Sequence, residues 1–189
     1  RSVEWKGYAQ TKNEANTWCR HDWILSIDAD EVRSTELIRT LQHWEPREHT
    51  VYCLDRMTNY CGHWVRHSGW YPDWKPRLFD RRKVKWTGEF VHETLAIPTH
   101  FQEEKLAGKL WHYSYRSAED HRQRIEKYAR LWAEEQFSRG RKWSFWKAGL
   151  SPLWRFIQTY LLKGGWRDGR TGWLISIRNA WMVRRRYIL

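Results

Sequence analysis

Three acidic residues follow a short apolar run near the beginning of the chain, and their spacing suits cation binding. The run at residues 23–27 is bounded by polar residues and predicts a buried strand, after which come Asp28, Asp30 and Glu31. Ligands of an open α/β sheet bind at the carboxyl ends of its strands. Two Asp side chains at i and i+2 can share one hard cation there, and that cation can hold a diphosphate. The alternatives are a solvated acidic strand end or the start of a helix cap, and Glu31 fits the cap.

Strands and helices are expected to alternate around this motif. Helices are predicted at residues 7–20, after the N-cap Ser34, and from the N-cap Ser117 to Gly140. Strands are predicted at residues 23–27, 51–54, 77–79, 84–86 and 109–113. The strands at 77–79 and 84–86 flank a charged turn and predict a hairpin, whereas residues 59–74 predict an extended loop with strand pieces. This alternation is typical of an α/β fold.

The composition indicates one globular domain with a basic appendage. The chain has 189 residues, 16 Trp and a net charge of +12. Its 3 Cys have no zinc spacing and are odd in number, which favours reduced thiols in a cytoplasmic protein. No apolar run has the length of a membrane span, and no signal peptide opens the sequence. Residues 139–189 hold 12 Lys or Arg against one acid, Asp168, so we expect a boundary near Gly140.

Several stretches, in their order along the whole chain, resemble the inverting family 2 glycosyltransferases. The resemblance is closest to the group that adds glucose to the inner core of lipopolysaccharide. It implies a partial GT-A (Rossmann-like) domain at residues 1–139, followed by basic, Trp-rich amphipathic helices at 140–189. The matching stretches are residues 5–13, 25–31, 71–72 with 77–79, 91–93, 110–115 and 164–170.

The resemblance implies a UDP-sugar donor and a divalent metal, Mn or Mg, bound to the donor diphosphate. Asp30 would bind the metal, while Asp28 would face the ribose or the sugar. His112 would complete the metal site, since imidazole is a reasonable partner to carboxylate for Mn; the alternative is a structural histidine. Lys12 and Asn13 would contact the donor nucleotide, although a basic residue on a helix is usually a solvated one.

The resemblance also implies a general base for inversion by single displacement. We expect Glu93 to be the base and His92 to position it, with an exposed polar pair after a strand as the alternative. Arg77 would bind phosphate or acidic groups of the acceptor, and a structural ion pair is equally consistent with the sequence. Trp70 and Tyr71, with Trp64 and Trp74, would form an aromatic wall for the acceptor sugar, or else pack in the core.

The basic C-terminal region has three interpretations. Trp and Leu recur at helical spacing with Lys and Arg elsewhere on the wheel, which favours helices lying on an anionic membrane surface. Helices that dock on the sheet come second. A nucleic-acid-binding module without catalysis comes third, because no recognised nucleic-acid motif is present.

We therefore expect a metal-dependent inverting transferase at the inner face of the cytoplasmic membrane, acting on a lipid-linked or lipopolysaccharide-core acceptor, with no nucleic-acid partner. Family members begin with a strand–helix–strand portion that binds the base and ribose, and this sequence, which starts at Arg1, has no counterpart of it. The chain is thus expected to be a fragment without UDP-sugar turnover. The strand at 23–27, suited to the middle of a parallel sheet, would then lie at an exposed edge and promote association.

Overall fold

A computed structural model describes residues 5, 7–88, 93–138, 140 and 145–188; for Glu135 and residues 145–147 it describes the backbone alone. The chain divides into two compact units. The first unit comprises residues 1–56 and 74–110, and the second comprises residues 57–73 and 111–189. These limits differ from the compositional boundary near Gly140, and the domains 1–139 and 140–189 stay a prediction.

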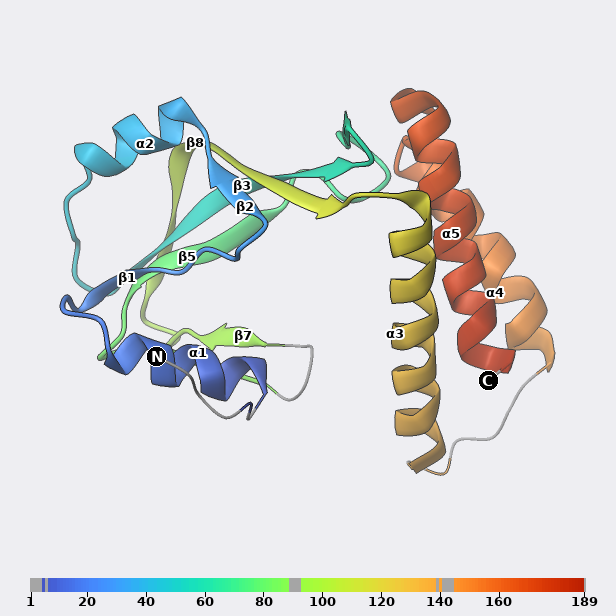
Figure 1. The fold of residues 1–189 in the computed structure, drawn as a ribbon, viewed down its shortest axis with the longest axis horizontal. Coiled ribbons are helices and arrows are strands. Elements are labelled where there is room, and N and C mark those ends of the chain that lie inside the picture. The colour runs from blue at the N-terminus through green and yellow to red at the C-terminus, as the bar shows by residue number, and fades with distance from the viewer. Residues whose placement is uncertain (1–4, 6, 89–92, 139, 141–144, 189) are drawn as a thin grey trace. The chain divides into compact units, whose positions relative to one another are not determined.

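The fold is a mixed α/β arrangement, as the sequence predicts at the level of class (Figure 1). One sheet has the strand order β1-β5-β3-β8-β2, with β4 paired to β3, and a second sheet consists of β6 and β7. Their bounds are β1 Trp23–Leu25, β2 Glu31–Arg33, β3 Thr50–Tyr60, β4 His63–Trp64, β5 Trp74–Asp80, β6 Lys85–Thr87, β7 Thr94–Ala96 and β8 Gln102–Tyr115. Within the part of the chain that the structure describes, β1 pairs with β5 alone and lies at the sheet edge. The β1–β5 and β3–β5 pairs are antiparallel, so the parallel neighbours expected for the 23–27 strand are not found there.

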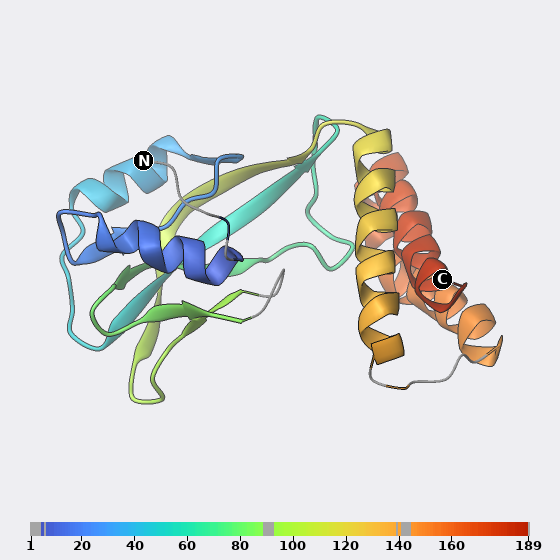
Figure 2. The same ribbon diagram turned by 60° about the horizontal axis from the view of Figure 1, so that its bottom comes forward.

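Alternating side chains give the first unit a core on both faces of its sheet. Ile24 and Phe79 pack in one cluster, whereas Leu78 packs in the other, because successive residues of a strand point to opposite faces. Helix α1 (Tyr8–Thr17) contributes Ala9 to the first cluster, and α2 (Thr35–Gln42) contributes Leu37 to the second. The two helices therefore cover opposite faces of the sheet, as Figures 1 and 2 show.

Helix α2 begins where the sequence predicts. The Ser34 hydroxyl accepts a hydrogen bond from the Leu37 amide at 3.1 Å and a second one from the Lys109 amide of β8 at 2.9 Å. Gly108 allows this close approach: it has φ +99°, and a Cβ there would lie 2.3 Å from the Leu37 nitrogen. The cap thus ties α2 to β8.

The predicted hairpin of residues 77–79 with 84–86 is wrong. Strand β5 pairs with β1 and β3, while β6 pairs with β7. The Asp80 carboxylate accepts hydrogen bonds from the Arg82 amide at 2.9 Å and from its guanidinium, and the Val84 amide bonds to the Asp80 carbonyl. This turn directs β6 away from β5, and Trp86 packs instead in the cluster that contains Ala9.

The second unit is dominated by helices, which Figure 1 shows side by side. Ser117 caps α3 by accepting from the Asp120 amide at 3.0 Å, and Gly140, with φ +67°, donates to the Phe137 carbonyl, so both predicted ends of this helix are confirmed. A π-helical turn follows α4, and a 3-10 turn precedes α5. Their bounds are α3 Ala118–Ser138, α4 Phe145–Ile157, the π-helical turn η1 Gln158–Leu162, the 3-10 turn η2 Gly165–Asp168 and α5 Gly169–Ile188. No helix among the described residues has the length and apolar character needed to cross a bilayer.

An aromatic cluster joins the start of α3 to the strand and loop residues of the second unit. His121 is 4% exposed, and its Nδ1 lies 3.0 Å from the Tyr60 hydroxyl. The Tyr115 ring stacks on Trp70 and also lies against His121, with ring centroids 5.5 Å and 4.5 Å apart. Burial, followed by the nearby charges of Arg178 and Arg124, lowers the pKa of His121 to about 4. The imidazole is therefore neutral at pH 7 and packs as a core side chain.

Candidate active site

The acidic motif lies in a turn between β1 and β2. Strand β1 ends at Leu25, and the Ser26 amide then bonds to the Arg77 carbonyl of β5 at 2.8 Å. The Glu31 amide bonds to the Asp28 carbonyl, and the Asp28 amide bonds back to Oε2 of Glu31, both at 3.0 Å. These reciprocal bonds fix the turn at the carboxyl end of β1, which is where the sequence predicts a site.

The Arg77 side chain of β5 forms ion pairs with two acids of this turn, Asp28 and Glu31. Its Nη2 lies 2.7 Å from Oδ2 of Asp28 and 2.7 Å from Oε1 of Glu31. The Glu31 side chain has no exposed surface, and Arg56 of β3 approaches the same Oε1 at 3.5 Å. Glu31 therefore begins β2 as a buried ion-pair partner, and the helix cap that the sequence allowed for it is provided by Ser34.

Lys12 extends the network from α1. Its Nζ lies 3.1 Å from Oδ1 of Asp28 and 3.3 Å from Oε1 of Glu93, and it also lies 4.5 Å from the centre of the Trp86 ring. One ammonium group thus holds the predicted donor-side acid and the predicted base in a single arrangement. The two carboxylates are 65 positions apart in the sequence, so only the fold brings them together.

The charges in this network shift the pKa values of Asp28 and Arg77. Burial alone would raise the pKa of Asp28, but the guanidinium of Arg77 and the ammonium of Lys12 hold that pKa below its usual value. Burial would likewise lower the pKa of Arg77, and the carboxylates of Glu31 and Asp28 instead raise it. Asp28 is therefore a carboxylate and Arg77 a cation throughout the physiological range.

The carboxylates present at the turn suit a metal that is shared with a substrate. Among the described residues no group of three or more His, Cys, Asp or Glu is arranged to hold an ion. Mg²⁺, however, is commonly bound by one or two carboxylates together with substrate phosphates and water. Asp28 and Asp30 lie at the β1–β2 turn, and Asp28 contacts two cationic side chains there. Their role as metal ligands stays a prediction.

The other predicted donor residue, Asn13, has a different environment. Its amide nitrogen donates to the Trp86 carbonyl at 2.8 Å, and its Oδ1 accepts from the Trp86 amide at 2.9 Å. Asn13 thereby joins α1 to the edge of β6, and its contact with a donor stays a prediction. The predicted positioning residue His92 lies outside the described residues.

His112, Trp70 and Tyr71 belong to the second unit. The Nδ1 atom of His112 lies 3.3 Å from the Thr58 hydroxyl of the neighbouring strand β3. Trp70 is partly exposed and packs against Tyr60 and Tyr115, which agrees with the core-packing alternative. Tyr71 precedes the cis peptide bond to Pro72. The metal role of His112 and the acceptor roles of Trp70 and Tyr71 stay predictions.

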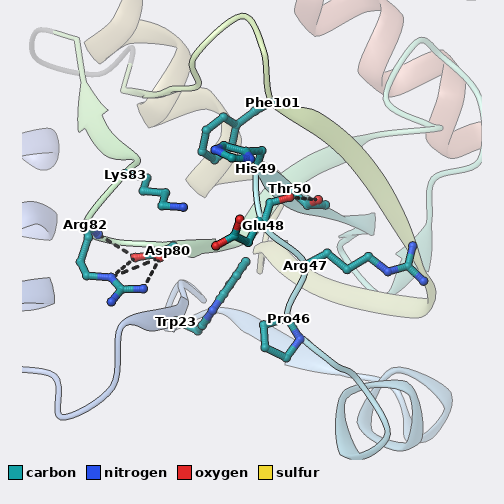
Figure 3. Close-up of a pocket in the computed structure, with 10 residues that line it drawn as sticks. All are labelled: Trp23, Pro46, Arg47, Glu48, His49, Thr50, Asp80, Arg82, Lys83 and Phe101. Atoms are coloured by element: carbon teal, nitrogen blue, oxygen red, sulfur yellow. Dashed lines mark hydrogen bonds and ion pairs between the residues drawn. The ribbon is translucent and has the colours of Figure 1, made fainter.

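A cavity of about 200 Å³ lies at the opposite, amino end of β1 (Figure 3). Three of the charged side chains there are paired: Asp80 with Arg82 at 2.7 Å, and Arg47 with Glu104 at 3.0 Å. None of the sequence-predicted site residues lines it. Its lining residues are Trp23, Pro46, Arg47, Glu48, His49, Thr50, Asp80, Arg82, Lys83 and Phe101. We therefore place the candidate active site at the β1–β2 turn.

Two members of that site were not found from the sequence. Arg56 lies within a long strand whose pattern gives no sign of a buried ion pair, and Trp86 was assigned only to a strand. The single available signal for Trp86 was its place between a basic turn and the His92–Glu93 pair. Contacts over such sequence distances follow from the fold, and no local pattern encodes them.

Comparisons with known proteins agree with the resemblance in the motifs. No protein-family model matches the chain. An uncharacterized glycosyltransferase of Rickettsia prowazekii is 26% identical over 92% of this chain and 63% of its own length. A lipopolysaccharide core biosynthesis glycosyltransferase of Rhizobium meliloti, LpsC, is 25% identical over 93% of this chain and 66% of its own length. The chain thus spans about two thirds of the length of these relatives. Over nearly all of its own length it is similar to curated glycosyltransferases, including one of lipopolysaccharide core biosynthesis.

Proposed function

We propose that the chain carries the catalytic centre of an inverting, metal-dependent family 2 glycosyltransferase with a GT-A fold. The reaction is transfer of a hexose, glucose from a UDP-sugar, to a lipid-linked or lipopolysaccharide-core acceptor. The observation that carries the proposal is the ion-pair chain Asp28–Lys12–Glu93, which joins the acid after the carboxyl end of β1 to the candidate base. The similarity to a lipopolysaccharide core glycosyltransferase supports this acceptor class.

Glu93 is the general base in this proposal. The acceptor hydroxyl gives its proton to the Glu93 carboxylate while its oxygen forms the new bond to the anomeric carbon. The bond from that carbon to the diphosphate breaks on the opposite face, and its electron pair leaves with the nucleoside diphosphate. Lys12 positions Glu93 relative to Asp28, and the Arg77–Glu31 pair holds Asp28 in its turn.

Asp30 and Asp28 would hold Mn²⁺ or Mg²⁺ together with the donor diphosphate. When bound, the cation supplies charge neutralisation at the leaving group. The role of Asp28 is twofold in this view, because its carboxylate also contacts Lys12 and Arg77. The placement of Lys12 near that acid agrees with a position close to the donor.

The base assignment is tested by Glu93→Gln in the full-length protein. Gln keeps the size and hydrogen bonding of the side chain but takes no proton, so turnover should fall about 10²–10⁴-fold while UDP affinity stays unchanged. Glu104→Gln, at an exposed pair with Arg47, is the matched control and should retain full turnover. Turnover of the Glu93 variant within a few-fold of the parent protein would remove Glu93 from the role of base.

The metal assignment is tested by calorimetry with UDP and Mn²⁺ or Mg²⁺, which needs no turnover. Asp30→Asn should abolish the metal-dependent part of UDP binding and leave thermal unfolding unchanged. Asp22→Asn is the control, because Asp22 is an acid at the amino end of β1 that pairs with Arg81 and Arg82. Metal-dependent binding that survives Asp30→Asn contradicts the assignment.

A further inference from the structure

The helices that end the second unit carry bulky apolar side chains on their outer surface. Each of six such side chains is between 55% and 68% exposed. Large apolar side chains that gather on the outside of a soluble unit mark an interaction surface. We call this set the apolar patch, and it consists of Leu150, Leu153, Trp154, Leu161, Leu162 and Trp166.

The spacing of the patch on α4 shows that it is one side of a helix. Leu150, Leu153 and Trp154 stand at i, i+3 and i+4, so these three side chains lie on one side of α4. Leu161 and Leu162 follow in η1. Trp166 extends the exposed apolar surface into η2.

Other side chains of the same segment pack within the unit. Thr159 is 2% exposed and donates to the Arg155 carbonyl at 2.9 Å, while the Arg155 guanidinium donates to the Gln158 side chain at 3.0 Å. Toward α5 the segment presents the rings of Phe156 and Tyr160, which contact Trp173. Phe156 and Tyr160 therefore make the contacts of this segment with α5, whereas the leucines of the patch face away from the unit and can contact a partner.

Positive charge surrounds the patch. Lys163 and Arg167 are exposed on either side of Trp166, and Arg170 is exposed in the first turn of α5. Residues 145–188 contain nine Lys or Arg and one acid, Asp168. That acid is engaged within the unit, where its carboxylate accepts from the amides of Arg66 and His67 at 3.2 Å and 2.9 Å. The surface around the patch consequently attracts anions.

We infer that the apolar patch and its basic rim dock on an anionic lipid bilayer. Leu and Trp side chains enter the boundary between headgroups and acyl chains, and Lys and Arg remain at the level of the anionic headgroups. Nucleic acid matches the charge but gives the leucines at the centre of the patch nothing to pack against. The helices lie on the membrane rather than across it, since none of the described helices can span one. The inference rests on this surface alone and does not depend on the proposed transfer reaction.

Binding to sedimented vesicles tests the inference without donor or acceptor. The full-length protein should bind vesicles containing phosphatidylglycerol, with a blue shift of Trp emission, and should bind more weakly as salt rises. Replacing Lys163, Arg167 and Arg170 by Gln should lower the partition coefficient about fivefold for each charge removed, or about a hundredfold together. Equal binding to pure phosphatidylcholine vesicles, or no binding to either, overturns the inference.

A second pair of variants tests the apolar part separately. Leu153→Ser with Leu162→Ser should abolish vesicle binding, whereas Phe137→Ser, at an exposed apolar residue of α3 outside the patch, should leave it unchanged. Circular dichroism establishes that the variants are folded. Binding to a DNA duplex that is tighter than binding to anionic vesicles, or a dimer that forms through the patch and excludes lipid, contradicts the proposed partner.

Discussion

Replacing Arg77 by Met removes the cation that pairs with both Asp28 and Glu31 in the candidate active site. Loss of one partner from a buried ion pair costs about 3–5 kcal/mol, because the other charge is left without compensation. Only Glu31 carries this cost here: its side chain is fully buried, whereas Asp28 is 37% exposed and keeps Lys12. Arg56 at 3.5 Å retains part of the compensation for Glu31, so we expect the lower end of the range, about 3 kcal/mol.

Urea unfolding followed by Trp fluorescence measures this loss. A decrease of about 3 kcal/mol shifts the midpoint by roughly 1–3 M urea for ordinary slopes. The double variant Arg77→Met with Glu31→Met should recover most of the stability, since apolar replacement of a buried pair is often neutral or stabilising. Arg47→Met, at an exposed pair with Glu104, should leave the midpoint nearly unchanged. A single variant as stable as the parent, or a double variant less stable than the single one, would refute the reasoning.

Three further predictions concern other contacts of the two units. His121 has a pKa lowered from 6.5 to about 4, so as the pH falls the unfolded chain is protonated at this residue before the folded one. The stability that the neutral His121 contributes is fully present above pH 6.5, and it falls by about 3 kcal/mol towards pH 4. His121→Gln should flatten this pH dependence in unfolding measured at several pH values. Gly108→Ala should cost about 2 kcal/mol or more in thermal unfolding, because it adds a clash with Leu37 to the strain of positive φ; Gly62→Ala, which has the same strain and open space, should cost less. Asp168→Asn leaves one oxygen to accept from the Arg66 and His67 amides, and hydrogen exchange at these amides should accelerate.

The parts of the fold that were predictable from the sequence are those that local chemistry determines. Ser34 and Ser117 begin helices because their hydroxyls accept from amides three positions onward, and Gly140 ends α3 because it adopts positive φ. The apolar run before Asp28 forms β1 for the same kind of reason, since its side chains alternate between two cores. Each of these signals involves residues only a few positions apart.

The features that the sequence did not predict depend on distant partners. The pairing of β6 with β7 rather than β5 follows from the Asp80 turn together with the packing of Trp86 near Ala9. The burial of Glu31 depends on Arg77, 46 positions away, and no periodicity identifies that pair. The sequence left Arg77 open between a ligand contact and a structural ion pair. The 2.7 Å contacts show the ion pairs, and the ligand contact stays a prediction.

The charge balance of the candidate site gives the proposed metal dependence a physical reason. Lys12, Arg56 and Arg77 provide three positive charges, and Asp28, Glu31 and Glu93 provide three negative ones, so these paired groups are neutral together before a donor binds. Asp30 adds one further negative charge at the turn. A nucleoside diphosphate that arrived alone would place uncompensated negative charge close to Asp28 and Glu93. A divalent cation held by Asp30, Asp28 and the diphosphate would offset that charge. On this reasoning metal and donor bind together, and neither binds tightly in the absence of the other.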